Sequence, residues 1–333
     1  MASKSCMRLA PLRSSVLLAL LLLLAGLVGG CATSSPSSPS PTSTPVPGIR
    51  GIFHEYTLPP SQFVPRNITM GPDGNLWFTE GGRIARITPL GKISEFKLSA
   101  PTSAQSIATG PDGNLWFTDQ SKIGRMTLTG KVSEFSLPIH QFPAGSNPIK
   151  APAGSGPNQA LAITAGPDGN LWFTEIGPDE VGSSIGRITT SGKITEFPLP
   201  STHIFLSSIT AGPDGNLWFT GIGTNNGLSM IGMITPQGKI REFTFLHSIF
   251  GSITRGPDGN LWFTAFQYGV TGAEAGKIEN ITTAGKLSDF PLPTTSYVPT
   301  SITFGTDQTL WFIEVEVTVS DPSGKNGKIG HLV

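Results

Sequence analysis

Cysteine and charged residues are scarce in this sequence, and neither charge is in excess. Only 2 of the 333 residues are cysteine, Cys6 and Cys31, and both stand near the N-terminus. The remainder of the chain therefore offers no thiol for a disulfide or for a thiolate metal site. Charged residues make up 13%, with 22 basic and 22 acidic side chains. Because a basic excess is what attracts a phosphate backbone, we expect no nucleic-acid partner.

Residues 1–30 have the pattern of a secretory signal. Basic residues precede an apolar run from Val16 to Val28 that is too short for a permanent membrane-spanning helix. The segment from Val28 to Cys31 (VGGC) resembles the bacterial lipobox, which implies cleavage before Cys31 and a lipid on that cysteine. The alternatives are an uncleaved anchor and an ordinary signal in which the cysteine is a coincidence.

The rest of the chain divides into a tether and one domain. Residues 31–47 are rich in serine, threonine and proline, so we expect an extended tether that begins at lipidated Cys31. Residues 48–333 are expected to fold as one monomeric domain. We expect the protein to be secreted and then held at the membrane by the lipid, at the cell surface or on the periplasmic side of a bacterial envelope.

One unit is repeated six times along the chain. The motif GPDGNLWFT, whose last copy is degenerate, begins at Gly71, Gly110, Gly166, Gly212, Gly256 and Gly305. Each copy is flanked by an upstream I-T, a downstream I-G-R-I-T and a segment such as ITEFPLP at Ile194 to Pro200. Asp-Gly between apolar runs is the strongest short-range hairpin signal. We therefore expect four antiparallel strands, a to d, in each unit, with the repeated tryptophans packed between units.

These repeats predict an all-β fold, a β-propeller of six four-stranded blades. Units with one buried face each must stack on their neighbours, and radial closure removes the exposed sheet edges. The last unit ends at Val333 without its fourth strand. The segment Phe53 to Pro59 aligns with Ile194 to Pro200, so we expect it to supply that strand and close the ring.

Loop lengths separate the two faces of the predicted ring. The a–b and c–d turns keep a constant length, whereas the b–c and d–a connections vary, which favours ligand binding on the face that carries the variable loops. Aromatic side chains such as Phe266 and Tyr268 either line an apolar site there or pin the loops to the ring. Arg66 and Gln105 belong to the same face.

Carboxylates and two histidines are further candidates. Several second strands end in an acid: Glu80, Asp119, Glu175 and Glu314, with Glu316 just beyond. These acids either bind a cation and raise one another's pKa, or simply form hydrogen bonds to neighbouring strand ends. His203 and His247 occupy matching positions in adjacent units, where they either share a metal or flank a substrate, or remain solvated.

The repeat resembles that of the virginiamycin B lyase family over Phe53 to Val333. The resemblance implies a propeller of seven blades, one more than the repeats predict, and a magnesium-assisted elimination that opens a cyclic antibiotic at an ester bond. It also implies a histidine base, but Gly251 and Thr300 stand at the corresponding positions. The other units carry Arg66, Gln105, Leu161 and Ser207 there. Glu314 and Glu316 lie near the position of the family's metal-binding glutamate.

Two functions follow as hypotheses. The first is a lipid-anchored propeller that binds a small molecule, a peptide or a glycan on its elaborated face. The second is a metal-dependent enzyme that opens a cyclic ester, either a carbon–oxygen lyase of the streptogramin B type or a lactonase. The second would use Mg²⁺ at Glu314 and Glu316, with His203 and His247 as substitute bases, and it implies a role in antibiotic resistance.

Overall fold

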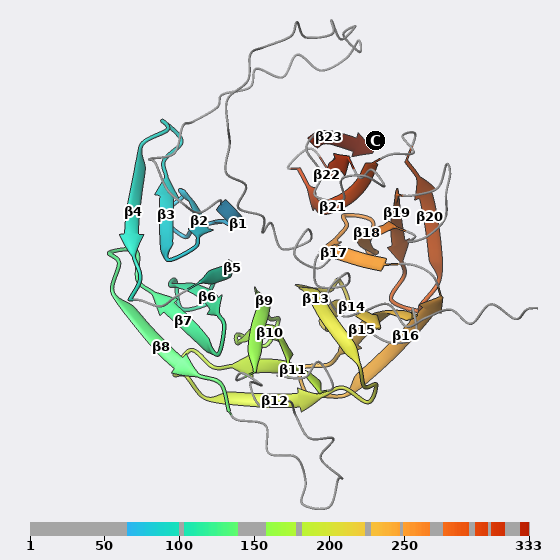
Figure 1. Ribbon diagram of the computed structural model, residues 1–333, viewed down its shortest axis with the longest axis horizontal. Coiled ribbons are helices and arrows are strands. Elements are labelled where there is room, and N and C mark those ends of the chain that lie inside the picture. Colours follow the sequence, from blue (N-terminus) through green and yellow to red (C-terminus); the bar gives the residue numbers. More distant parts are fainter. Residues whose placement is uncertain are drawn as a thin grey trace, which may run out of the picture.

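The chain is a six-bladed β-propeller, as the repeats predict. The computed structural model describes residues 65–99, 103–138, 158–177, 182–223, 228–246, 249–266, 276–292, 297–305, 308–316 and 327–332. These residues form six antiparallel sheets that radiate from a common axis (Figure 1). No helix among them is long and apolar enough to cross a membrane.

Each of the first three blades is a four-stranded meander in which spatial order follows chain order. The first contains β1 (Pro65–Met70), β2 (Leu76–Glu80), β3 (Arg83–Ile87) and β4 (Ile93–Lys97). The second contains β5 (Ala104–Thr109), β6 (Leu115–Asp119), β7 (Lys122–Met126) and β8 (Val132–Ser136). The third contains β9 (Gln159–Ala165), β10 (Leu171–Ile176), β11 (Ser183–Ile188) and β12 (Ile194–Pro198).

The last three blades repeat the same order. The fourth contains β13 (Ile204–Ala211), β14 (Leu217–Gly223), β15 (Leu228–Ile234) and β16 (Ile240–Leu246). The fifth contains β17 (Ile249–Arg255), β18 (Leu261–Phe266), β19 (Gly276–Ile281) and β20 (Leu287–Pro291). The sixth has three described strands, β21 (Tyr297–Phe304), β22 (Leu310–Glu316) and β23 (Gly327–Leu332). The expected closing strand, Phe53 to Pro59, lies outside the described residues.

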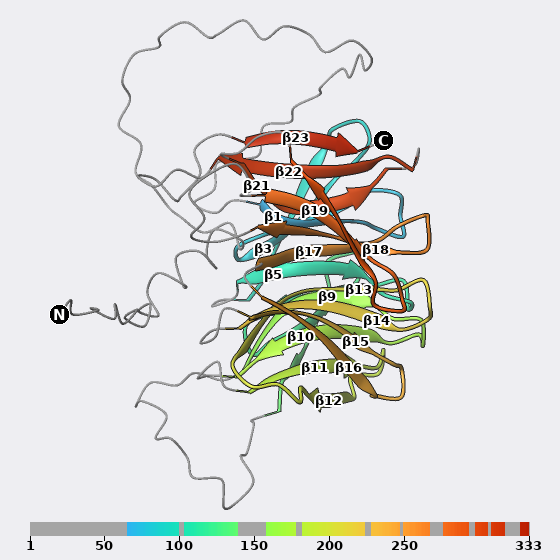
Figure 2. The same cartoon turned by 90° about the vertical axis from the view of Figure 1, so that its right-hand side faces the viewer.

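The first strand of every blade lines the centre of the ring, and the fourth strand of the first five blades lies at the rim (Figure 1). The tight turns gather on one side of the ring, which Figure 2 shows edge-on. The connections of variable length therefore belong to the opposite side, as expected. On that side the b–c connection grows from Gly81 and Gly82 in the first blade to residues 317–326 in the sixth.

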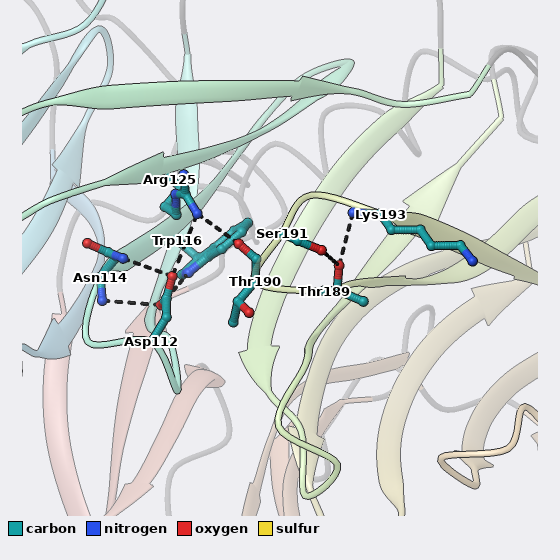
Figure 3. Close-up of polar contacts among 8 residues, drawn as sticks. All are labelled: Asp112, Asn114, Trp116, Arg125, Thr189, Thr190, Ser191 and Lys193. Atoms are coloured by element: carbon teal, nitrogen blue, oxygen red, sulfur yellow. Dashed lines mark hydrogen bonds and ion pairs between the residues drawn. The ribbon is translucent and has the colours of Figure 1, made fainter.

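Each GPDGN turn fixes a tryptophan, fully buried in the first four blades, and Figure 3 shows the turn of the second blade. Asp112 Oδ1 accepts hydrogen bonds from Trp116 Nε1 at 2.9 Å and from the Asn114 amide at 3.2 Å. Asp112 Oδ2 accepts from Asn114 Nδ2 at 2.8 Å. The turn itself needs the positive φ of Gly113, 72°. These contacts give the repeated aspartate a structural role in the turn.

The same tryptophan holds the next blade. Trp116 is fully buried and stacks on Phe135, with ring centroids 5.6 Å apart. Arg125 covers the tryptophan ring at 5.6 Å, and its Nη1 donates a 2.8 Å hydrogen bond to the Thr190 carbonyl of the third blade (Figure 3). Gly192 in that third-blade turn has no side chain because a Cβ would lie 2.1 Å from the Phe135 ring. The tryptophans thus pack between blades, as predicted.

One buried acid departs from the repeat. Glu279 on β19 stands opposite Phe263 and is 4% exposed, whereas the matching position in the second blade is Gly124, on which the Phe117 ring packs. Burial raises the pKa of Glu279 to about 7; the charge of Lys277 opposes this rise, and that of Asp289 adds to it.

Glu279 should make stability depend on pH. Because the folded chain keeps a proton that the unfolded chain loses above its ordinary pKa of 4.5, stability should fall as the pH rises from 4.5 to about 7. Glu279→Gln should remove roughly 2–3 kcal/mol of that fall. Denaturant unfolding across this pH range measures the effect. An unchanged pH profile in the variant would contradict the assignment.

Closure of the ring gives a second prediction. Ile68 is 57% exposed and Leu76 38%, whereas their second-blade counterparts Ile107 and Leu115 are 3% and 0% exposed. In the sixth blade, at the other end of the ring, Ile313 on β22 is 46% exposed. A strand from Phe53 to Pro59 would cover this apolar surface.

A chain without residues 1–47 should therefore unfold cooperatively, and a chain without residues 1–60 should unfold at a clearly lower temperature. Circular dichroism melts of the two proteins measure this difference. Equal melting temperatures would show that Phe53 to Pro59 does not close the ring.

Candidate functional site

A β-bulge interrupts the innermost strand of every blade and creates one repeated position at the centre. In the first blade Pro65 pairs with Glu80 and Ile68 with Phe78, so Arg66 and Asn67 together face Thr79. The same shift occurs in β5, β9, β13, β17 and β21. Bulges re-aim side chains and are frequent beside active sites. The bulge positions are Arg66, Gln105, Leu161, Ser207, Gly251 and Thr300.

The threonine of each LWFT motif builds this bulge. Thr118 Oγ1 accepts the Ser106 amide of its own blade at 3.1 Å and donates to the Leu161 carbonyl of the next blade at 2.8 Å. Thr220 likewise donates to the Gly251 carbonyl at 2.7 Å. Backbone groups at the bulge make these bonds. The geometry of the position therefore does not depend on which side chain occupies it.

The bulge side chains offer hydrogen-bond donors and hydroxyls, with no histidine among them. Burial lowers the pKa of the Arg66 guanidinium from its ordinary value, and Arg66 has no ion-pair partner among the described residues. Gln105 is half-buried, and the Ser207 hydroxyl lies 2.8 Å from the Thr220 hydroxyl. Arg66 and Gln105 belong to neighbouring inner strands, because Thr79 Oγ1 donates to the Gln105 carbonyl at 3.0 Å. The pair could donate to carbonyl oxygens of a ligand.

The two candidate histidines do not occupy this position. His203 precedes β13 with a positive φ of 61°, and its Nδ1 lies 3.1 Å from Thr202 Oγ1. It stands four residues before Ser207, which along an extended strand is about 13 Å. His247 lies outside the described residues, so a site shared by the two histidines stays a prediction.

The strand-end acids are buried, each within its own blade. Exposure is 1% for Glu80 and Glu175 and 5% for Asp119 and Glu314. Burial raises the pKa of Asp119, although its Oδ1 accepts the Ser103 amide at 2.7 Å. No three acidic, histidine or cysteine side chains of the described residues come close enough to hold a metal. These acids therefore do not form one shared metal site, and the Glu316 side chain lies outside the described part.

The two aromatic candidates, Phe266 and Tyr268, belong to the fifth blade and the connection that follows its second strand. Phe266 is 7% exposed at the end of β18, which fits a packing role, while Tyr268 lies outside the described residues.

Sequence reasoning missed Glu196 on β12. Burial, together with the charge of Glu196, raises the pKa of Glu175 to about 8. Only the register between β10, β11 and β12 brings these acids together. A comparison of the second, third and fourth strands of the repeats would have found the pair.

Known proteins resemble this chain in sequence as well as in fold. The sequence matches the virginiamycin B lyase family over residues 48–156 and 150–330. A solved streptogramin B lyase is 30% identical, with 80% of this chain and 78% of that chain covered and a TM-score of 0.60. A luciferin-regenerating enzyme, 17% identical over 80% of this chain and 90% of that chain with a TM-score of 0.54, shares the fold alone. No curated protein sequence matches significantly.

A second relative carries the family assignment. It is a catalytically inactive histidine-to-alanine variant of virginiamycin B lyase from Staphylococcus aureus, solved with quinupristin. It is 34% identical, with 84% of this chain and 85% of that chain covered and a TM-score of 0.66. With the family matched along nearly the whole propeller and this relative similar over most of both chains, the present chain belongs to the virginiamycin B lyase family.

Proposed function

We propose that this chain is a lipid-anchored member of the family that binds a cyclic peptide ligand and does not open it. The observation that carries the proposal is the set of side chains at the inner-strand bulges. Arginine, glutamine, leucine, serine, glycine and threonine occupy the six positions, and none is a general base at neutral pH. General base catalysis is worth typically ~10²–10⁴-fold in rate.

The ligand class follows from the donors at the centre and from the family. A cyclic depsipeptide such as quinupristin presents several amide and ester carbonyls. The donors of Arg66 and Gln105 on adjacent inner strands suit such carbonyls. The bulge geometry that positions them rests on backbone hydrogen bonds, so it persists without the histidine. The chain therefore keeps the means to bind this ligand without the means to open it.

A lyase is the second candidate, and Glu314 is the observation that favours it. This glutamate lies on β22, two residues before its end, with 5% exposure, near the position that the family resemblance assigns to a metal ligand. The donor set shown here is a single carboxylate, which is too little to hold magnesium by itself. Under this alternative, Glu316 and a histidine would complete the site.

Incubation with quinupristin separates the two candidates. We expect calorimetry to show binding, and mass spectrometry to show no linear product with or without Mg²⁺. Arg66→Ala combined with Gln105→Ala should weaken binding roughly 10-fold or more through the lost hydrogen bonds. Lys193→Ala, on the turn face, is the matched control and should bind as the unchanged chain does. Magnesium-dependent opening by the unchanged chain would refute the binding-only proposal.

The lipid anchor has its own test. Expressed in a bacterial host with labelled palmitate, the unchanged chain should incorporate label and sediment with membranes. Cys31→Ala should abolish the label and shift the protein to the soluble or uncleaved fraction, because the lipidation signal needs that thiol. Cys6→Ala is the control and should behave as the unchanged chain. Equal labelling of the Cys31→Ala variant would exclude Cys31 as the attachment site.

A further inference from the structure

The side of the ring that carries the tight turns, here called the turn side, presents a lysine from each of the first five blades. The lysine follows the glycine of the c–d turn: Lys92, Lys131, Lys193, Lys239 and Lys286. All five are exposed, and none forms an ion pair with another described residue. Because each directly precedes a fourth strand, the five lie around the rim of the turn side (Figure 1).

The turn uses the backbone of the lysine and not its side chain. In the third blade the Lys193 amide donates to Thr189 Oγ1 at 3.0 Å, and the Lys193 carbonyl accepts from the Thr189 amide at 3.0 Å. The amide bond recurs at 3.0–3.1 Å in the other four turns. Figure 3 shows the Lys193 ammonium directed away from Thr189. The fold therefore fixes where each lysine stands but does not require a charge there.

Arginines offset the acids of the turn side. In each of the first three blades an arginine Nη1 lies 3.7–4.0 Å from Oδ2 of the turn aspartate. In the fourth and fifth blades, whose turn aspartates are Asp214 and Asp258, an exposed arginine stands next to a tight turn, Arg241 and Arg255 respectively. The five lysines therefore remain as a surplus of positive charge on the described part of this side.

Basic residues that begin third strands, on the opposite side of the ring, are paired with acids instead. Lys122 Nζ lies 2.6 Å from Glu134 Oε2, and Lys277 Nζ lies 3.6 Å from Asp289 Oδ2. The two sides of the ring thus differ in how their basic residues are balanced.

A single exposed leucine stands among the lysines of the turn side. Leu90 lies in the first c–d turn, two residues before Lys92, and is 95% exposed. The exposure belongs to the position and not to the open edge of the ring, because the equivalent residues of the next four turns are also exposed: Thr129, Ser191, Gln237 and Ala284. An apolar side chain held in water beside basic residues is typical of surfaces that enter the headgroup region of a bilayer.

We propose that the turn side of the propeller docks on anionic phospholipid headgroups, with the five lysines against the headgroups and Leu90 inserted between them. Lysines close to an anionic bilayer are attracted to it, and the attraction decays over about 10 Å at 0.1 M salt. No other described side chain of these turns is a large apolar residue with comparable exposure.

The direction of the fourth strands connects this surface to the tether. Each described fourth strand runs from its c–d turn toward the opposite side of the ring. A closing strand from Phe53 to Pro59, which lies outside the described residues, would therefore place the tether on the turn side. Docking extends the lipid anchor of the proposed function, on which it rests in the cell, and it leaves the variable connections facing away from the bilayer.

The test is the reactivity of the five lysines in the full chain, purified from bacterial membranes and reconstituted on vesicles. A water-soluble amine reagent and peptide mass spectrometry give the modification rate of each lysine. On vesicles that contain phosphatidylglycerol the five should react roughly fivefold more slowly than on phosphatidylcholine alone, and high salt should remove the difference. Lys97, exposed at the opposite end of the first blade, should react equally on both. Equal rates for the five lysines on both vesicles would overturn the proposal.

Charge reversal locates the surface. Lys131→Glu should restore most of the reactivity of the four remaining lysines on anionic vesicles, and Leu90→Asp should restore that of all five. Lys97→Glu is the matched control, because it makes the same change of charge on the opposite side, and the protection should persist. Full protection in both Lys131→Glu and Leu90→Asp, or its loss in Lys97→Glu, would overturn the proposal.

Sedimentation with phosphatidylcholine vesicles reports the lipid anchor separately. A chain that does not sediment with them lacks the anchor, and its lysines are then compared between anionic vesicles and solution, where the same protection is expected. A chain that sediments with both vesicles but shows no protection has the anchor without the docking surface. Failure of the anchor and failure of the docking surface are therefore distinct results.

Discussion

The fold depends on the contact between one blade and the next. A single four-stranded meander has two faces and cannot bury either one alone, so its stability comes from neighbours. The tryptophan of each LWFT motif provides the contact, and Asp112 and Arg125 show how the blade itself fixes that ring. Arg125 then reaches the Thr190 carbonyl of the next blade. Turn chemistry, ring stacking and blade spacing are therefore one linked set of interactions.

This dependence places the blade contacts on one side of the ring and the variable connections on the other. The clamps occupy the side of the tight turns, where any change of length would move a tryptophan or an arginine. The clamp loosens along the chain, since Met233, Asn280 and His331 replace the arginine in the last three blades. The variable connections leave from the other side, which is free of this constraint. Under the proposed function, ligand recognition changes there while the blade contacts persist.

The repeats made the fold predictable, and the site was much less so. Blade number, strand order and the turn role of Asp112 follow from local patterns that recur along the chain. The bulge at Arg66 and the meeting of Glu175 with Glu196 follow from register between strands, which no single segment encodes. His203 was a candidate because its spacing matches that of His247. Spacing along the chain does not say which residue lies at the centre of the ring, and His203 precedes the bulge position, Ser207, by four residues.

The bulge explains how a chain can stay in the family while the base is absent. Thr118 and Thr220 bind backbone groups of the inner strands, so the fold requires a bulge but sets no requirement on its side chain. Replacing a histidine at the bulge by another residue removes a general base at little cost in stability. Under the proposed function, the donors of Arg66 and Gln105 then remain for the ligand. A changed side chain at the bulge therefore alters the chemistry at the centre of the ring and leaves the bulge itself in place.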